Sequence, residues 1–175
     1  MSQLSSTSER EGIRKTPDTR ETHWAPLRFY AELYVEHSRS DVWSYFSDLA
    51  KWRRWSPICC GCRLIDNGRL QVDSVLEIRF KVVGVTIRVP ARVLQFNPSE
   101  SMTWQGQKFG ISANHTYRFI PHNHGTLLCN DETLFGTGFP LNRLITAWYR
   151  LGKVSSESLK GLRRELGETT SGTAR

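Results

Sequence analysis

The sequence predicts an α+β domain in which a curved antiparallel sheet of about six to seven strands wraps around one long C-terminal helix. Three observations lead to this fold class. Segments of period two follow one another with short turns between them, and each is apolar on one side only. Two short helical segments follow the first of these strands, and the chain closes with an apolar stripe at helical spacing.

The first element is a half-buried strand that begins at Leu27, where apolar and charged residues start to alternate. The residues before it, 1–26, are polar and rich in Ser and Thr, which predicts a disordered tail without a signal peptide. We expect the folded domain to span residues 27–167 and residues 168–175 to be a flexible C-terminus. The absence of a long apolar run predicts no transmembrane segment and a cytoplasmic protein.

Next comes a short amphipathic helix, because Ser38 and Asp41 resemble a capping box and Val42, Trp43, Phe46 and Leu49 follow at helical spacing. A second helical turn carries KWRRW and stops before Pro57.

The stretch KWRRWSP interleaves aromatic rings with cations, as single-stranded RNA binders and membrane anchors do. Trp52 and Trp55 are three residues apart and therefore share one helix face, whereas Arg53 and Arg54 point elsewhere. We therefore predict a structural corner in which Trp55 and Pro57 fix the short helices to the sheet, with the arginines solvated.

Six further strands are predicted at residues 58–66, 74–83, 85–96, 102–109, 111–121 and 126–135. One-sided strands joined by short turns favour an antiparallel meander, whose apolar face needs a cover. The cover is a helix starting at Pro140, with a continuous stripe of Leu144, Trp148, Leu151, Ser155, Leu159, Leu162 and Leu166. At about 1.5 Å per residue it would be roughly 40 Å long.

Four short motifs occur in order between Phe29 and Leu166: DVWSYFSDLAKWRRWSP, MTWQG, GTLLCNDETLFG and LKGLRREL. Together they resemble the helix-grip (SRPBCC) superfamily of START lipid-transfer domains, birch-pollen-allergen-like proteins, and bacterial polyketide cyclases and dehydratases. The first is similar to that superfamily's first helix and Trp-Ser-Pro corner, and the third to its Gly-Thr…Glu…Gly strand. The resemblance implies a hydrophobic cavity for lipids, polyketides, quinones or other apolar small molecules.

Within strand 111–121, an outward Arg118 would place His115, Tyr117 and Phe119 on the concave side. If Phe119 pairs with Leu128, His115 lies opposite Glu132. An imidazole and a carboxylate in an apolar pocket could enolise a β-ketone or protonate a leaving hydroxyl. The same two groups could instead simply satisfy each other's hydrogen bonds.

The predicted function is binding or transfer of an apolar small molecule between the sheet and the long helix. The alternative is a cofactor-independent polyketide-type cyclase, aromatase or dehydratase with His115, Tyr117 and Glu132 as catalytic residues. The predicted ligand-binding residues are Phe46, Trp55, Ile78, Phe80, Val93, Trp104, His115, Tyr117, Leu128, Glu132, Leu144 and Trp148.

The spacing of the cysteines and the net charge bear on metals, cofactors, membranes and nucleic acids as partners. Three of the four cysteines lie at Cys59, Cys60 and Cys62, which is not a disulfide framework and lacks a second ligand pair, so we predict no metal and no organic cofactor. The net charge of +7 allows transient contact with a membrane surface. No Gly-rich RNA motif is present, so no nucleic-acid partner is predicted. The sequence does not predict the oligomeric state.

Overall fold

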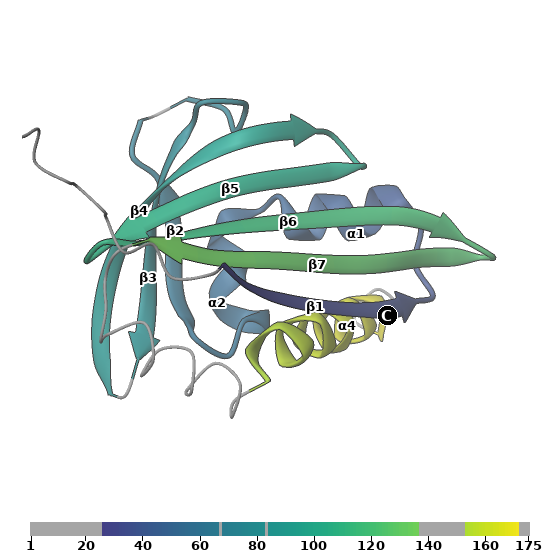
Figure 1. Cartoon of the computed structure of the whole chain (residues 1–175). Helices are drawn as coiled ribbons and strands as arrows, with labels where there is room; N and C mark the ends of the chain where they lie inside the picture. The colour runs from purple at the N-terminus through teal and green to yellow at the C-terminus, as the bar shows by residue number, and fades with distance from the viewer. Residues whose placement is uncertain (1–25, 67, 83, 137–152, 172–175) are drawn as a thin grey trace, which may run out of the picture.

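The computed structural model describes residues 26–66, 68–82, 84–136 and 153–171 (Figure 1). Within them, seven antiparallel strands form one curved sheet in the order β1-β7-β6-β5-β4-β3-β2. The predicted sheet is thereby confirmed. The strands are β1 (Leu27–Val35), β2 (Cys59–Leu64), β3 (Val75–Val82), β4 (Val85–Asn97), β5 (Ser101–Lys108), β6 (Ile111–His122) and β7 (Gly125–Gly136).

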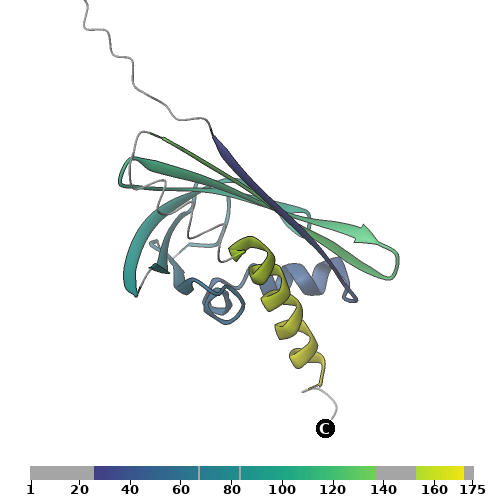
Figure 2. The ribbon, with the colours of Figure 1, turned by 60° about the horizontal axis from the view of Figure 1, so that its bottom comes forward.

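The described helices lie on the concave face of this sheet (Figures 1 and 2). They are α1 (Arg39–Phe46), the 3-10 turn η1 (Leu49–Lys51), α2 (Trp52–Trp55) and α4 (Val154–Ser171). The predicted cap of α1 is confirmed, since the Asp41 backbone N–H donates to the Ser38 hydroxyl at 3.2 Å. Two short helical segments after the first strand were therefore correctly predicted.

The KWRRWSP corner is buried through its tryptophans, as predicted. Trp52 and Trp55 are each only 3% exposed, whereas Arg53 and Arg54 are exposed. The indole N–H of Trp52 donates to the Phe46 carbonyl oxygen at 2.7 Å, which ties α2 to the end of α1. These aromatic rings join the core, so they do not form a surface for stacking bases.

The terminal helix α4 is seated on α2 and β1. At Gly161 the helix comes so close to α2 that a Cβ would lie 2.0 Å from the Trp55 carbonyl oxygen. Beside this contact, the Glu165 carboxylate accepts a hydrogen bond from the Tyr45 hydroxyl. It also forms an ion pair with Arg54, whose Nε is 2.9 Å away. One carboxylate thus joins α1, α2 and α4.

The prediction of one uninterrupted helix from Pro140 to Leu166 is wrong. Lys153 has a φ of 46°, in the left-handed region, and α4 begins only at Val154. The helix also runs on to Ser171, past the predicted end at Leu166. Residues 1–25 and 137–152, with the predicted tail and with Leu144 and Trp148, lie outside the described residues.

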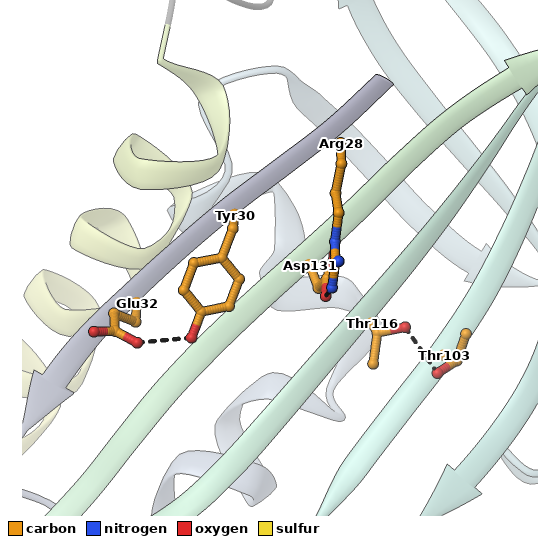
Figure 3. A network of polar contacts seen from close by, with 6 residues as sticks. All are labelled: Arg28, Tyr30, Glu32, Thr103, Thr116 and Asp131. Atoms are coloured by element: carbon orange, nitrogen blue, oxygen red, sulfur yellow. Dashed lines mark hydrogen bonds and ion pairs between the residues drawn. The ribbon is translucent and has the colours of Figure 1, made fainter. Parts of the chain in front are cut away.

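The convex face of the sheet is polar, as the alternation predicts. Arg28 and Asp131 form an ion pair across β1 and β7, with Nε and Oδ1 2.9 Å apart (Figure 3). Thr103 and Thr116 share a hydrogen bond of 3.1 Å across β5 and β6 in the same view. The apolar residues of the sheet are therefore gathered mainly on the opposite, concave face.

Replacing Gly161 with alanine is expected to destabilise the protein, although alanine is the better helix former. The added methyl group would overlap the Trp55 carbonyl oxygen, so α4 would have to move away from α2. We expect the free energy of unfolding to fall by about 1–3 kcal/mol in urea titrations. The control is Gly167→Ala in the same helix, where a Cβ meets nothing within 4 Å. It should gain up to about 1 kcal/mol, and equal losses in both variants would contradict the close approach.

Candidate ligand-binding site

A cavity of about 140 Å³ lies on the concave side of the sheet, at the end where the β3–β4 and β5–β6 turns are found. The side chains around it are almost all apolar. Its wall consists of Ile58, Phe80, Ile87, Val89, Trp104, Gly106, Lys108, Phe109, Ile111, Ala113, His115, Glu132 and Leu134.

The cavity exists because side-chain size falls along the inner face of β6. Phe119 and Tyr117 are buried among the aromatic rings of α1 and α2. His115 follows, and then the much smaller Ala113 and finally Ile111 at the turn. Among the described residues, no aromatic ring of α1 or α2 lines the cavity. The small side chains of β6 therefore leave space unfilled, which a close-packed interior otherwise avoids.

The neighbouring strand β5 repeats this change, from Trp104 to Gly106. The pairing of β4 with β5 ends at Ala91 and Gly106. The first residues of β4, which begins at Val85, and the last residues of β5, which ends at Lys108, lie beyond this pairing. The two hairpins are therefore not paired to each other at the cavity end.

His115 and Glu132 lie side by side in the inner wall of the cavity. They are paired across β6 and β7, and His115 Nε2 is 3.1 Å from Glu132 Oε1. Both are buried, with 8% and 1% of their surface exposed. The Trp104 ring stacks on the imidazole, with 3.9 Å between centroids and 14° between planes. The predicted pairing of Phe119 with Leu128 and of His115 with Glu132 is confirmed.

Burial lowers the pKa of His115 from 6.5 to about 3. The imidazole is therefore neutral at neutral pH, and the contact with Glu132 is a hydrogen bond with one proton between Nε2 and Oε1. This pair and Lys108 are the polar side chains of an otherwise apolar wall, and the buried pair can fix the orientation of a bound molecule.

Tyr117 lies one step away from this pair and does not line the cavity. Its ring is 4.8 Å from that of Phe46, within the aromatic core, and it pairs with Asn130 across β7. Burial, and next the nearby Glu132 charge, raise the pKa of its hydroxyl. The structure thus brings together two of the three predicted catalytic residues.

The predicted ligand-binding residues divide into two described groups. Phe80, Trp104, His115 and Glu132 line the cavity. The others are buried in the core beside it: Phe46, Trp55, Ile78, Val93, Tyr117 and Leu128.

Sequence reasoning missed the small and edge residues of the wall, above all Gly106, Ala113 and Phe109. The signal that could have found them is the loss of bulk at every second position toward the β5–β6 turn.

The described cysteines are free thiols, and burial raises the pKa of Cys59 to about 11. Within the described ranges, no group of three or more His, Cys, Asp or Glu side chains could hold a metal ion. None of the helices in the same ranges is long and apolar enough to cross a membrane.

The model of the family described as polyketide cyclase / dehydrase and lipid transport matches residues 27–167. The chain belongs to this family. Within curated proteins it is similar to toxin Rv0910 of Mycobacterium tuberculosis, with 26% identity over 113 residues, which are 63% of this chain and 78% of the toxin.

Two solved structures share the fold of this polyketide cyclase / dehydrase and lipid transport family member. The Zhui aromatase/cyclase from Streptomyces sp. R1128 superposes with a TM-score of 0.69 at 12% identity, covering 83% of this chain and 96% of that one. A START superfamily protein from Mycobacterium smegmatis gives 0.64 at 15% identity, covering 81% and 98%. The helix-grip fold is therefore confirmed.

Stability should fall in acid through His115. Its pKa is about 3 in the folded protein against 6.5 ordinarily, so below pH 6.5 the unfolded chain takes up a proton that the folded protein refuses. This contribution is fully present above pH 6.5 and is lost toward pH 3, at up to about 1.4 kcal/mol per pH unit. Urea unfolding at a series of pH values should show a shallower loss for His115→Gln than for the wild type. The exposed His122, changed to Gln, is the matched control, and parallel curves for all three proteins would refute the assignment.

Proposed function

We propose that this protein binds or transfers an apolar small molecule, such as a lipid, polyketide or quinone, in the cavity of the concave face. The observation that carries the proposal is an apolar wall whose polar members are Lys108 and the hydrogen-bonded His115 and Glu132. A pocket of this kind combines affinity from apolar burial with orientation from a few polar atoms. The membership of the family described as polyketide cyclase / dehydrase and lipid transport supports it.

The size of the cavity limits what it encloses. About 140 Å³ is close to the roughly 150 Å³ that an engineered protein cavity needs to hold one benzene ring. One aromatic ring or the end of one acyl chain therefore fits in the cavity. The rest of a larger ligand would extend toward the hairpin turns.

A hydroxyl or carbonyl group on the ligand is the natural partner for the His115–Glu132 pair. The neutral imidazole and the carboxyl group offer both a donor and an acceptor at the wall. Because both residues are buried, a ligand group that breaks the hydrogen bond between them has to replace it with a hydrogen bond of its own.

The second candidate is a cofactor-independent cyclase, aromatase or dehydratase. The 3.1 Å contact between His115 and Glu132 inside the cavity favours it, as does the similarity of the fold to the Zhui aromatase/cyclase. In this reading the pair would move a proton to or from the carbon chain of the ligand. Tyr117 would support it only indirectly, since it lies in the core.

Filling the cavity should abolish binding. Ala113→Leu adds bulk inside the wall, so we expect an apolar fluorophore to lose at least about ten-fold in affinity, because the space for one ring disappears. Fluorescence titration measures this, with displacement by fatty acids and polycyclic aromatic phenols as competitors. The control is Leu94→Phe, which adds similar bulk at an exposed position of β4. Equal affinity in Ala113→Leu and the wild type would show that the cavity is not the binding site.

Removing the imidazole separates the two functions. His115→Ala should abolish any turnover of a polyketide-type substrate while leaving the affinity for the apolar fluorophore within about three-fold of the wild type, since the remaining wall is apolar. Product mass spectrometry reports turnover, and fluorescence titration reports binding. Turnover that survives in His115→Ala would eliminate the enzymatic candidate for this pair. Native mass spectrometry of the protein purified from its own host would identify the co-purified molecule.

A further inference from the structure

The β5–β6 turn presents a large apolar side chain to solvent in an unfavourable backbone conformation. Phe109 and Gly110 are the two turn residues, with φ of 53° and 71°, and the Phe109 side chain is 60% exposed. Two-residue turns with both φ positive favour Asn or Asp followed by Gly, because a bulky residue is strained there. At the opposite end of the sheet, the β6–β7 turn has Asn123 at φ 50°. Phe109 therefore does not suit the turn, and its ring lies exposed at the edge of the cavity and not in the core.

The surroundings of Phe109 are cationic. Residues 78–99 and 101–130 contain arginines and lysines but no Asp or Glu. Lys108 places its Nζ 5.3 Å from the Phe109 ring centroid. Lys81 is exposed at the end of β3, and neither lysine has a carboxylate partner within 4 Å among the described residues.

A second exposed apolar side chain lies in the neighbouring hairpin. Val85 begins β4 and is 63% exposed, two residues before the cavity-lining Ile87. Both hairpin ends lie at the same end of the sheet (Figure 1), and residues from both line the cavity. Phe109, Lys108 and Ile111 form its wall on one side.

We propose that Phe109 and Val85, with Lys81 and Lys108, form a membrane-docking surface that rests on anionic phospholipid at the mouth of the cavity. The two apolar side chains enter the boundary between headgroups and acyl chains, and the ammonium groups contact lipid phosphates. This is the usual division of labour in peripheral membrane binding. An apolar molecule could then pass between bilayer and cavity without crossing water.

Charge and polarity favour a bilayer over the other occupants. A nucleic acid would satisfy the lysines but would offer no apolar phase for Phe109. A second copy of this chain, placed symmetrically, would bring like charges together. An anionic bilayer supplies both the apolar phase and the negative charge.

The decisive variant is Phe109→Asn, because asparagine suits the turn and removes the ring. We expect its thermal unfolding midpoint to be equal to or above that of the wild type. Its binding to phosphatidylcholine vesicles that contain phosphatidylglycerol should weaken about ten-fold in co-sedimentation of the full chain. Lys81→Gln with Lys108→Gln should weaken it about as much, and added salt should act in the same direction.

The matched control is Ile120→Asn, an exposed apolar residue at the far end of β6, which should bind vesicles like the wild type. The proposal is overturned if the wild type does not sediment with these vesicles, or if Phe109→Asn binds them equally well. It is also overturned if Ile120→Asn loses as much. A wild-type dimer in sedimentation velocity that Phe109→Asn dissolves would assign the surface to a second copy instead. Ala113→Leu separates this surface from the proposed binding function, because it fills the cavity but leaves Phe109 and Lys108 in place, so it should sediment with vesicles like the wild type.

Discussion

The packing of Phe46 against the inner face of β6 is the contact on which the rest of the structure depends. Its fully buried ring lies 4.8 Å from Tyr117 and 5.1 Å from Phe119, and 5.5 Å from Trp52 on its other side. This cluster holds the short helices on the sheet, and α4 closes over α2 in turn. Among the described residues, these rings cover one end of the concave face, and the cavity lies at the other end. Core and cavity are thus two parts of one apolar surface, divided by where the large side chains stop.

The His115–Glu132 pair lies on that dividing line. A buried polar pair costs desolvation, and apolar residues of similar volume are often as stable or more so. Stability alone therefore gives no reason for this pair. Its position does, because the Trp104 ring covers one face of the imidazole, while the cavity lies along the wall that the pair shares with Ala113. The pair is covered on one face by Trp104 and adjoins the cavity where a ligand group would lie.

The meander from β2 to β7 and the pairing of His115 with Glu132 could be predicted from the sequence, because short turns between long alternating strands restrict the register. The place of β1 beside β7 was not predicted. The position of the cavity could not be predicted either. The inner face is mostly apolar along its length, and the volume of each side chain distinguishes filled from empty space. The break before α4 was also missed, because the apolar stripe continues past Lys153 and lysine rarely adopts positive φ. The spacing of apolar residues therefore predicts which face of an element is buried. The volumes of the side chains and the backbone strain decide where the cavity lies and where a helix begins.

The protonation of His115 bears on the choice between carrier and enzyme. A general base works best when its pKa is near the pH of the reaction, and an imidazole with a pKa of about 3 has little affinity for a proton at neutral pH. The same neutral imidazole remains a good hydrogen-bond partner, because it keeps one donor and one acceptor. Ligand binding would exclude more water from the wall, and desolvation disfavours the charged imidazolium further. Burial therefore weakens the His115 imidazole as a proton acceptor, with the Glu132 carboxylate 3.1 Å away beside it. The enzymatic candidate would accordingly depend on Glu132 as its base, whereas the proposed binding and transfer need only the hydrogen bonds of the pair.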